Sequence, residues 1–328
     1  MTQKRERIGY IDAAKGLAII LVIVGHSRAK NIPYLWDFIY SFHMPLFVII
    51  SGFFIKENNF YESIKKYARN YLKPYFVTSI LGLFIALLVS TIILPKEDII
   101  KIWFIRFLYA SSGCPSIYLS NIPIMGPIWF LWSLFWGCLI YTLIKRRFHG
   151  LGACITFIFI ATFGIYSSKI INLPLSFQSG CFFAAYIAIG NAIWRYDIIN
   201  TFQKCPWYIH LLCVILWGIS IYSNGFNLGA CYTGSPLNLI MSVISCLIII
   251  SFLNKLKIGG GWIGRSTLSI LCAHSLFHYI LYVFGHPHLT GIPKLDFLIT
   301  ASYEITIALG GAYFLQNIPI LRTIFKSK

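Results

Sequence analysis

Long apolar runs separated by short polar segments dominate the hydrophobic pattern of this chain. A helix needs about 20 apolar residues to cross the hydrocarbon core of a bilayer, and it satisfies its own backbone groups while doing so. The pattern therefore predicts an all-α fold, a polytopic integral membrane bundle of about ten transmembrane helices at residues 11–30, 35–55, 74–94, 126–144, 151–167, 174–194, 207–223, 235–254, 263–284 and 296–316. A further apolar stretch, residues 97–110, carries charges and is expected to lie along the membrane surface.

The composition fits this pattern, because 58% of the residues are hydrophobic and only 11% are charged. A soluble domain has about 25% charged residues. No polar stretch is long enough to form a soluble domain, so we expect one integral membrane domain over residues 1–328. The first span contains Asp12 and Lys15 and has no small-residue cleavage site, so it is expected to remain as an anchor.

The formal net charge of +17 would suit a nucleic-acid partner, but the basic residues lie in short loops between spans. Most of them fall on the side of the N-terminus. The exceptions, apart from Lys15 inside a span, are Arg28, Lys30, Lys96, Lys101, Arg106, Lys169 and Lys294. This asymmetry predicts that both termini are cytoplasmic. The partner implied by the charge pattern is the lipid bilayer, and no nucleic acid is expected.

None of the nine cysteines has the CxxC spacing of a thiolate metal site, and we expect no metal. Cys114 and Cys231 both fall in loops predicted to lie outside. An oxidising compartment would allow a disulfide between them, although we expect the two thiols to stay unpaired.

Asp12, Lys15 and His26 are the main candidates for chemistry, because they share one stripe of the first predicted span. Lys15 and His26 are eleven positions apart, which is about three helical turns. An ionisable side chain near the bilayer centre costs roughly 2.5–3.5 kcal/mol, so such a stripe is expected to face a protein interior or a watery cavity. His26 is suited to take a proton from a hydroxyl. Two interpretations of Lys15 stay open: it pairs with Asp12 and reaches the interface, or it holds a phosphate or thioester group.

Weaker candidates lie in three other spans. His43 is followed by Pro45, which should open the helix and free a backbone carbonyl beside a cavity; the alternative is a packing kink with an incidental histidine. His274 and His278 are four residues apart and share a face, but no third metal ligand accompanies them. Glu304 is a further intramembrane candidate on the same logic.

The segment 56–73 is polar, basic and aromatic, with cations at helical spacing at Lys65, Lys66, Arg69 and Lys73. One interpretation is attraction to anionic lipid head groups together with setting of the topology. The other is a cytoplasmic site for a phosphorylated donor.

Five stretches give the chain a resemblance to the membrane acyltransferase 3 family, also called the O-acyltransferase or fucose 4-O-acetylase-like group. They are Tyr10–Ser27 (YIDAAKGLAIILVIVGHS), Phe42–Phe54 (FHMPLFVIISGFF), Tyr67–Tyr75 (YARNYLKPY), Trp129–Phe135 (WFLWSLF) and Gly264–His274 (GRSTLSILCAH). Many larger members have acidic residues after the tryptophan of the fourth motif, whereas this chain has Leu134 and Phe135, as in the fucose 4-O-acetylase-like branch.

The resemblance implies transfer of an acyl group, with acetyl favoured, from acetyl-CoA or another acyl-CoA to a hydroxyl of a cell-envelope saccharide or glycolipid. It also implies a multi-pass protein of the bacterial plasma membrane. Acyl-CoA would be a substrate and no bound cofactor is expected. No hydrolase-like domain is seen after the last span, so separate partners in envelope-polysaccharide synthesis are an expectation. The alternatives are a transporter or flippase for a polar envelope intermediate, and a structural subunit of a polymer synthase.

The resemblance also suggests roles for individual residues. His26 would act as general base or carry the acyl group covalently, and Asp12 would hold Lys15. The residues expected to bind substrate are His43, His274 and Trp129, and those expected to bind the donor are Lys65, Lys66, Arg69 and Lys73.

Overall fold

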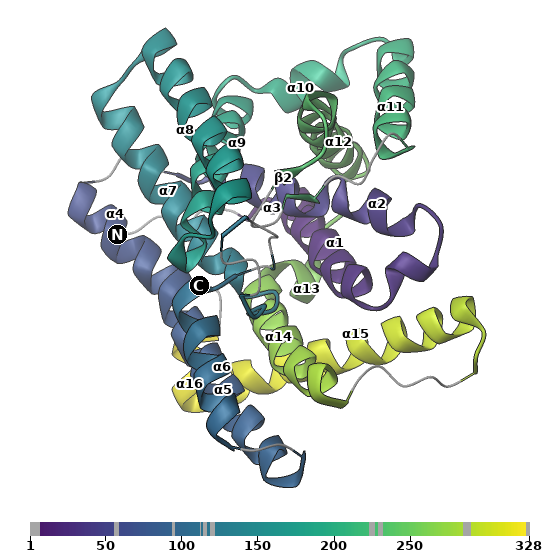
Figure 1. Cartoon of the computed structure of the whole chain (residues 1–328). Coiled ribbons are helices and arrows are strands. Elements are labelled where there is room, and N and C mark those ends of the chain that lie inside the picture. The colour runs from purple at the N-terminus through teal and green to yellow at the C-terminus, as the bar shows by residue number, and fades with distance from the viewer. Residues whose placement is uncertain are drawn as a thin grey trace.

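The computed structural model describes residues 7–55, 59–93, 96–111, 113, 117–118, 122–222, 227–228, 232–284 and 290–325. Helices make up nearly all of this part of the chain (Figure 1). The α-helices are α1 (Gly9–His26), α2 (Leu35–Tyr40), α3 (His43–Phe53), α4 (Phe60–Tyr67), α5 (Lys73–Ile93), α6 (Lys96–Tyr109), α7 (Trp129–Arg147), α8 (Gly150–Ile170), α9 (Phe177–Arg195), α10 (Ile198–Gln203), α11 (Trp207–Tyr222), α12 (Pro236–Lys255), α13 (Gly261–Arg265), α14 (Thr267–Phe284), α15 (Pro293–Asn317) and α16 (Pro319–Phe325).

Three short helices have a different pitch, and one small strand pair completes the described structure. The 3-10 helices are η1 (Ala29–Asn31) and η3 (Pro174–Ser176), and η2 (Ala68–Leu72) is a π-helix. Strand β1 (Asn227–Leu228) pairs antiparallel with β2 (Tyr232–Thr233).

Each predicted span contains one helix or two consecutive helices, with bounds within a few residues of the prediction. Within the described residues, six stretches are long and apolar enough to cross a membrane: Gly9–His26, Leu35–Phe53, Phe60–Leu88, Gly150–Ile170, Pro236–Lys255 and Pro293–Asn317. Trp207–Tyr222 and Thr267–Leu281 are apolar but shorter. A multi-pass helical membrane protein is therefore confirmed, while ten crossings and cytoplasmic termini stay predictions. The stretch expected along the surface forms α6, which packs against α5 and η3.

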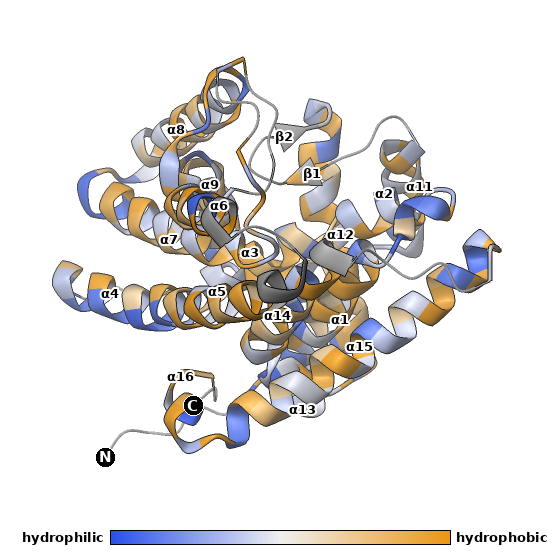
Figure 2. Ribbon diagram, turned by 60° about the horizontal axis from the view of Figure 1, so that its bottom comes forward, coloured by the Kyte–Doolittle hydropathy of each residue, from blue (hydrophilic) through white to orange (hydrophobic). Residues whose placement is uncertain are grey.

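The helix α8 shows the surface that such a protein turns to lipid. Only 17% of its most apolar window is buried, and it exposes large apolar side chains at Leu151, Ile155, Ile158 and Phe159. In Figure 2 apolar residues likewise cover the outer sides of helices as well as the inner ones. In water such a surface would be unfavourable, so hydrocarbon is its natural surrounding.

The second predicted span is broken at Ser41 and Phe42, a few residues before Pro45, and an opening near this proline was predicted from the sequence. Helix α2 ends at Tyr40 and α3 begins at His43, which makes Pro45 the third residue of α3. The first N–H groups of a helix have no partner within it, so proline causes no loss at this position. The turn is held from another helix, because Trp217 Nε1 donates to Ser41 Oγ at 2.9 Å.

Glycine contacts bring two pairs of helices into backbone contact. A Cβ atom on Gly52 of α3 would overlap the carbonyl of Ile187 in α9, and one on Gly190 would overlap the carbonyl of Ile49. In the same way, a Cβ on Gly264 of α13 would overlap the backbone of Asp12 in α1. Helix α1 also contacts α3, α12, α14 and α15 and is therefore enclosed by the bundle (Figure 1).

Candidate active site

A cavity of about 1180 Å³ lies between α1, α2, α3, α4, η2, α7, α13, α14 and α16. Its wall is formed by three parts of the chain, within residues 15–71, 127–138 and 265–324. Among the described residues that line it there is no aspartate or glutamate. Five of them are cations, which we call the cavity cations: Lys15, Lys66, Arg69, Arg265 and Arg322.

The stripe predicted on the first span faces this cavity. Lys15, Ile19, Val22 and His26 all line it, and their spacing of four, three and four residues places them on one side of α1. Lys15 and His26 are therefore roughly 16 Å apart along the cavity, at ~1.5 Å per residue. The pairing of Lys15 with Asp12 is confirmed, because its Nζ lies 2.6 Å from Asp12 Oδ1. The side chain also lines the cavity, and binding of a phosphate or thioester group there stays a prediction. Asp12 itself is not among the lining residues.

His43 lines the same cavity and has a defined orientation. Its Nδ1 lies 2.7 Å from the carbonyl oxygen of Ile39, and its ring meets Tyr40 edge-on with centroids 4.7 Å apart. A carbonyl oxygen only accepts hydrogen bonds, so Nδ1 carries the proton. In the neutral ring, Nε2 is then the nitrogen with a lone pair.

His274 and His278 surround His26 from α14. The ring centroid of His26 is 5.6 Å from that of His274 and 5.4 Å from that of His278. His274 was expected to line the cavity. It is instead fully buried, is not among the lining residues, and contacts His26. Neither ring nitrogen of His274 has a hydrogen-bond partner among the described residues. No group of three or more His, Cys, Asp or Glu side chains in the described chain is arranged to hold a metal ion.

Glu304 is also fully buried, on α15, and accepts a hydrogen bond from Ser27 Oγ at 2.6 Å. Ser27 directly follows His26 and caps the end of α1. Glu304, a weaker candidate from the sequence, is therefore bonded to the residue next to His26.

The basic segment before α5 contributes two of its four predicted cations to the cavity. Lys66 and Arg69 line it, whereas Lys65 and Lys73 are exposed and are not among the lining residues. The π-helix η2 has a wider turn than an α-helix and places three consecutive residues, Arg69, Asn70 and Tyr71, on the wall. A π-helix has no simple signature in sequence, so this arrangement was not predicted.

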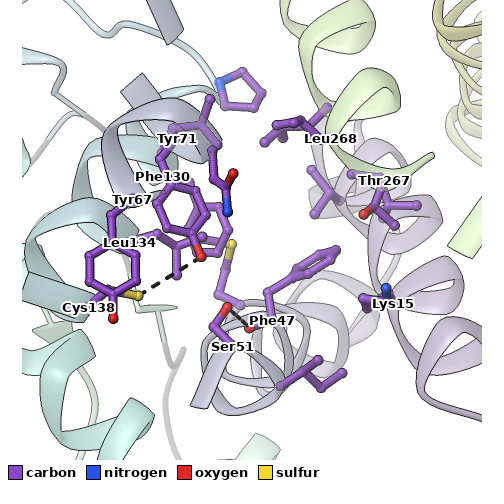
Figure 3. Close-up of a pocket in the computed structure, with 18 of the residues that line it drawn as sticks. Lys15, Phe47, Ser51, Tyr67, Tyr71, Phe130, Leu134, Cys138, Thr267 and Leu268 are labelled. Carbon is purple, nitrogen blue, oxygen red and sulfur yellow. Dashed lines mark hydrogen bonds between the residues drawn. The ribbon is translucent and has the colours of Figure 1, made fainter. Parts of the chain in front are cut away.

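Aromatic and small polar side chains form the wall that lies across the cavity from Lys15 (Figure 3). On that side Cys138 Sγ donates to Tyr71 OH at 4.0 Å. Tyr67 OH is hydrogen-bonded to Thr142 Oγ1 at 3.1 Å. Trp129, predicted to bind substrate, lines the cavity at the start of α7.

Arg265 and Arg322 were not singled out in the sequence. Arg265 ends α13, whose Gly264 contacts the backbone of α1, and its side chain lines the cavity. In the sequence, cations in loops were interpreted only as signals of topology. What distinguishes Arg265 from the others is the contact of the preceding Gly264 with Asp12, which is seen only in the structure. The predicted loop residues Cys114 and Cys231 lie outside the described residues.

Comparison with known proteins identifies the family of the chain. The model of the acyltransferase 3 family, described as an acyltransferase domain, matches residues 8–315. The chain belongs to this family, and its class is that of an acyltransferase.

A relative is the nodulation protein NolL of Sinorhizobium fredii, to which the chain is 28% identical over 232 residues. That match covers 65% of this chain and 58% of NolL, so the chain spans well under two thirds of the length of this curated relative. No solved structure matches the chain.

Proposed function

We propose that this protein is a membrane O-acyltransferase that moves an acyl group, with acetyl favoured, from cytoplasmic acyl-CoA to a hydroxyl of a cell-envelope saccharide or glycolipid. The observation that carries the proposal is a single cavity lined both by cations and by His26. The cations suit the phosphates of a CoA thioester, and the histidine suits the removal of a proton from an alcohol. Membership of an acyltransferase family supports the same reaction class.

His26 acts as general base in the proposed reaction. Its ring takes the proton of the acceptor hydroxyl as the oxygen attacks the thioester carbonyl carbon. A C–O bond forms, the C–S bond breaks, and the CoA thiolate leaves with the electron pair of that bond. The thiolate then receives the proton from His26, so the reaction consumes no other reagent. His274 and His278 pack against the His26 ring and restrict its orientation.

The cavity cations hold the donor in this proposal. Lys15 is oriented by its ion pair with Asp12, and Lys66 and Arg69 are presented by α4 and η2. Because the loops bearing most of the basic residues are predicted to be cytoplasmic, the donor enters from the cytoplasm and the acceptor from the outer half. His43 and Trp129 contact the substrates along the cavity wall.

The test is release of CoA from acetyl-CoA by purified protein in nanodiscs, with cell-envelope extract as acceptor and radiolabelled acetyl to identify the product. His26→Ala is expected to lower the turnover number at least about 100-fold, the usual contribution of a general base. His149→Ala is the matched control, because His149 is exposed directly before α8 and is not among the residues lining the cavity. Equal rates for His26→Ala and wild type would refute the role of His26.

A further inference from the structure

The short helix α16 follows the part of the chain that the family model matches. That match ends at residue 315, whereas α16 covers Pro319–Phe325. Three of its residues, Arg322, Thr323 and Ile324, nevertheless line the cavity. A segment beyond the family match thus completes the wall of the candidate active site.

A chain of hydrogen bonds fastens α16 in this position. Trp262 Nε1 donates to Gln316 Oε1 at 3.3 Å, and Gln316 Nε2 donates to Ser269 Oγ at 2.7 Å. Ser269 Oγ in turn donates to the carbonyl oxygen of Phe325 at 2.7 Å. Each of the three donor groups has one acceptor in this series of hydrogen bonds, and Ser269 and Phe325 are buried. The end of α16 is therefore bonded to α14, and the helix also packs against α15 and α5.

In this position α16 adds a fifth cation, Arg322, to the wall of the cavity. Arg322 joins Lys15, Lys66, Arg69 and Arg265 on a wall whose described residues include no carboxylate. Asp12 pairs with Lys15 but does not line the cavity. A cavity with this charge favours a ligand with several negative charges, and arginine suits phosphate oxygens because its guanidinium can donate two parallel hydrogen bonds.

We propose that α16 forms part of the donor site and that Arg322 binds a phosphate group of the adenosine diphosphate portion of acyl-CoA. The inference rests on the proposed function and extends it to a segment outside the family match. It assigns to Arg322 recognition of the nucleotide end of the donor, while the acyl-bearing pantetheine arm extends along the cavity towards His26.

The experiment compares two donors that differ only in the nucleotide portion, acetyl-CoA and S-acetylpantetheine. Arg322→Gln is expected to lower kcat/KM for acetyl-CoA about tenfold, mainly through KM, because a charge-assisted hydrogen bond to phosphate is lost. Transfer from S-acetylpantetheine by Arg322→Gln should be unchanged. Arg322→Lys keeps the positive charge and should therefore lose less of kcat/KM for acetyl-CoA than Arg322→Gln. Arg147→Gln is the matched control, since Arg147 is an exposed cation at the end of α7 and is not among the residues lining the cavity.

Other outcomes would overturn the inference. An equal loss with both donors would assign Arg322 a structural role only, and no loss with either would remove it from the donor site. The assays use nanodiscs of phosphatidylcholine alone and nanodiscs with added anionic lipid. An effect of Arg322→Gln confined to the anionic nanodiscs would assign the arginine to lipid head groups.

A binding measurement separates this inference from the proposed function. Titration with adenosine 3′,5′-bisphosphate, which has no acyl group, is expected to show weaker binding to Arg322→Gln than to wild type. If wild type transfers acetyl from neither donor, the proposed function fails. A loss of bisphosphate binding in Arg322→Gln would then still support a phosphate site on α16, and equal binding would overturn it.

Discussion

At the scale of single residues, one backbone hydrogen bond decides what His43 can do. The carbonyl of Ile39 fixes the proton on Nδ1, so the neutral ring carries its lone pair on Nε2. The break between α2 and α3 places this histidine at the first residue of α3, beside the carbonyl that orients it. We expect Nε2 to accept a hydrogen bond from a substrate hydroxyl in the cavity.

Replacing His43 by asparagine tests this expectation. An asparagine amide places its N–H group near the position of Nδ1, so the hydrogen bond to Ile39 can be kept while Nε2 is lost. We expect His43→Asn to remain folded and to lose acyl transfer by roughly tenfold or more, measured as CoA release. Thermal stability in detergent serves as the check on folding, and wild-type activity in His43→Asn would show that Nε2 has no role.

Lys15 both pairs with Asp12 and lines the cavity. Its ion pair with Asp12 is partly exposed, with 27% and 15% of the two side chains accessible. Such a pair contributes at most about 1 kcal/mol to stability. Its greater effect is on geometry, because it holds the ammonium group of Lys15 at the wall of the cavity.

At the scale of elements, glycines decide how closely the helices around the site approach each other. Gly52 and Gly190 let α3 and α9 meet backbone to backbone, and α3 carries His43 at its other end. A side chain at either position would have to push the two helices apart. Because packed cores resist such shifts, the change would be transmitted to the cavity wall.

Alanine at Gly52 is expected to destabilise the protein by about 1–3 kcal/mol, the usual cost of overpacking, and to lower its thermal midpoint in detergent. Gly152→Ala and Gly218→Ala are matched controls, because an added Cβ meets nothing within 4 Å at either position. Both controls are expected to be neutral or slightly stabilising, since alanine favours helix over glycine. A Gly52→Ala variant as stable as the controls would contradict the close contact of α3 with α9.

In the basic segment 56–73, helical spacing alone did not predict which cations line the cavity. Regular spacing placed Lys65, Lys66, Arg69 and Lys73 together in the sequence, but only Lys66 and Arg69 line the cavity. The π-helix η2 shifts the register between α4 and α5, so residues on either side of it do not share one continuous face. Lys65 and Lys73 are exposed and suited to lipid head groups.

At the scale of the whole molecule, the site depends on which side of the membrane each loop occupies. The positive-inside asymmetry predicts that the C-terminus, and with it α16, is cytoplasmic. The donor site proposed on α16 requires this orientation, because acyl-CoA is a cytoplasmic substrate in the proposed reaction.

Reporter fusions in a bacterial host test the orientation. Green fluorescent protein fused after Lys328 is expected to fluoresce, and alkaline phosphatase at the same position is expected to be inactive. A phosphatase fusion placed after Lys169, at the end of α8, is the control and should be active, because that loop is predicted to lie outside. Phosphatase activity at the C-terminus would contradict both the topology and the cytoplasmic entry of the donor.

The sequence by itself determined the helical membrane architecture, the places of the helices and the stripe of Lys15 and His26. These features are local, because a bilayer requires each helix to satisfy its own backbone and to be long enough to cross. The side chains of one helix are then arranged by a known period. The break before Pro45 was predictable for the same reason, since proline acts on its own turn.

Only the tertiary structure decided which distant residues share the cavity. Three contacts join positions far apart in the chain. His274 and His278 meet His26, Gly264 meets the backbone of Asp12 beside Arg265, and Ser269 holds Phe325 at the end of the helix that carries Arg322. The direction of each side chain there depends on how helices cross and how closely their backbones approach. Those distances are set by many long-range contacts at once, and no local pattern in the chain contains them.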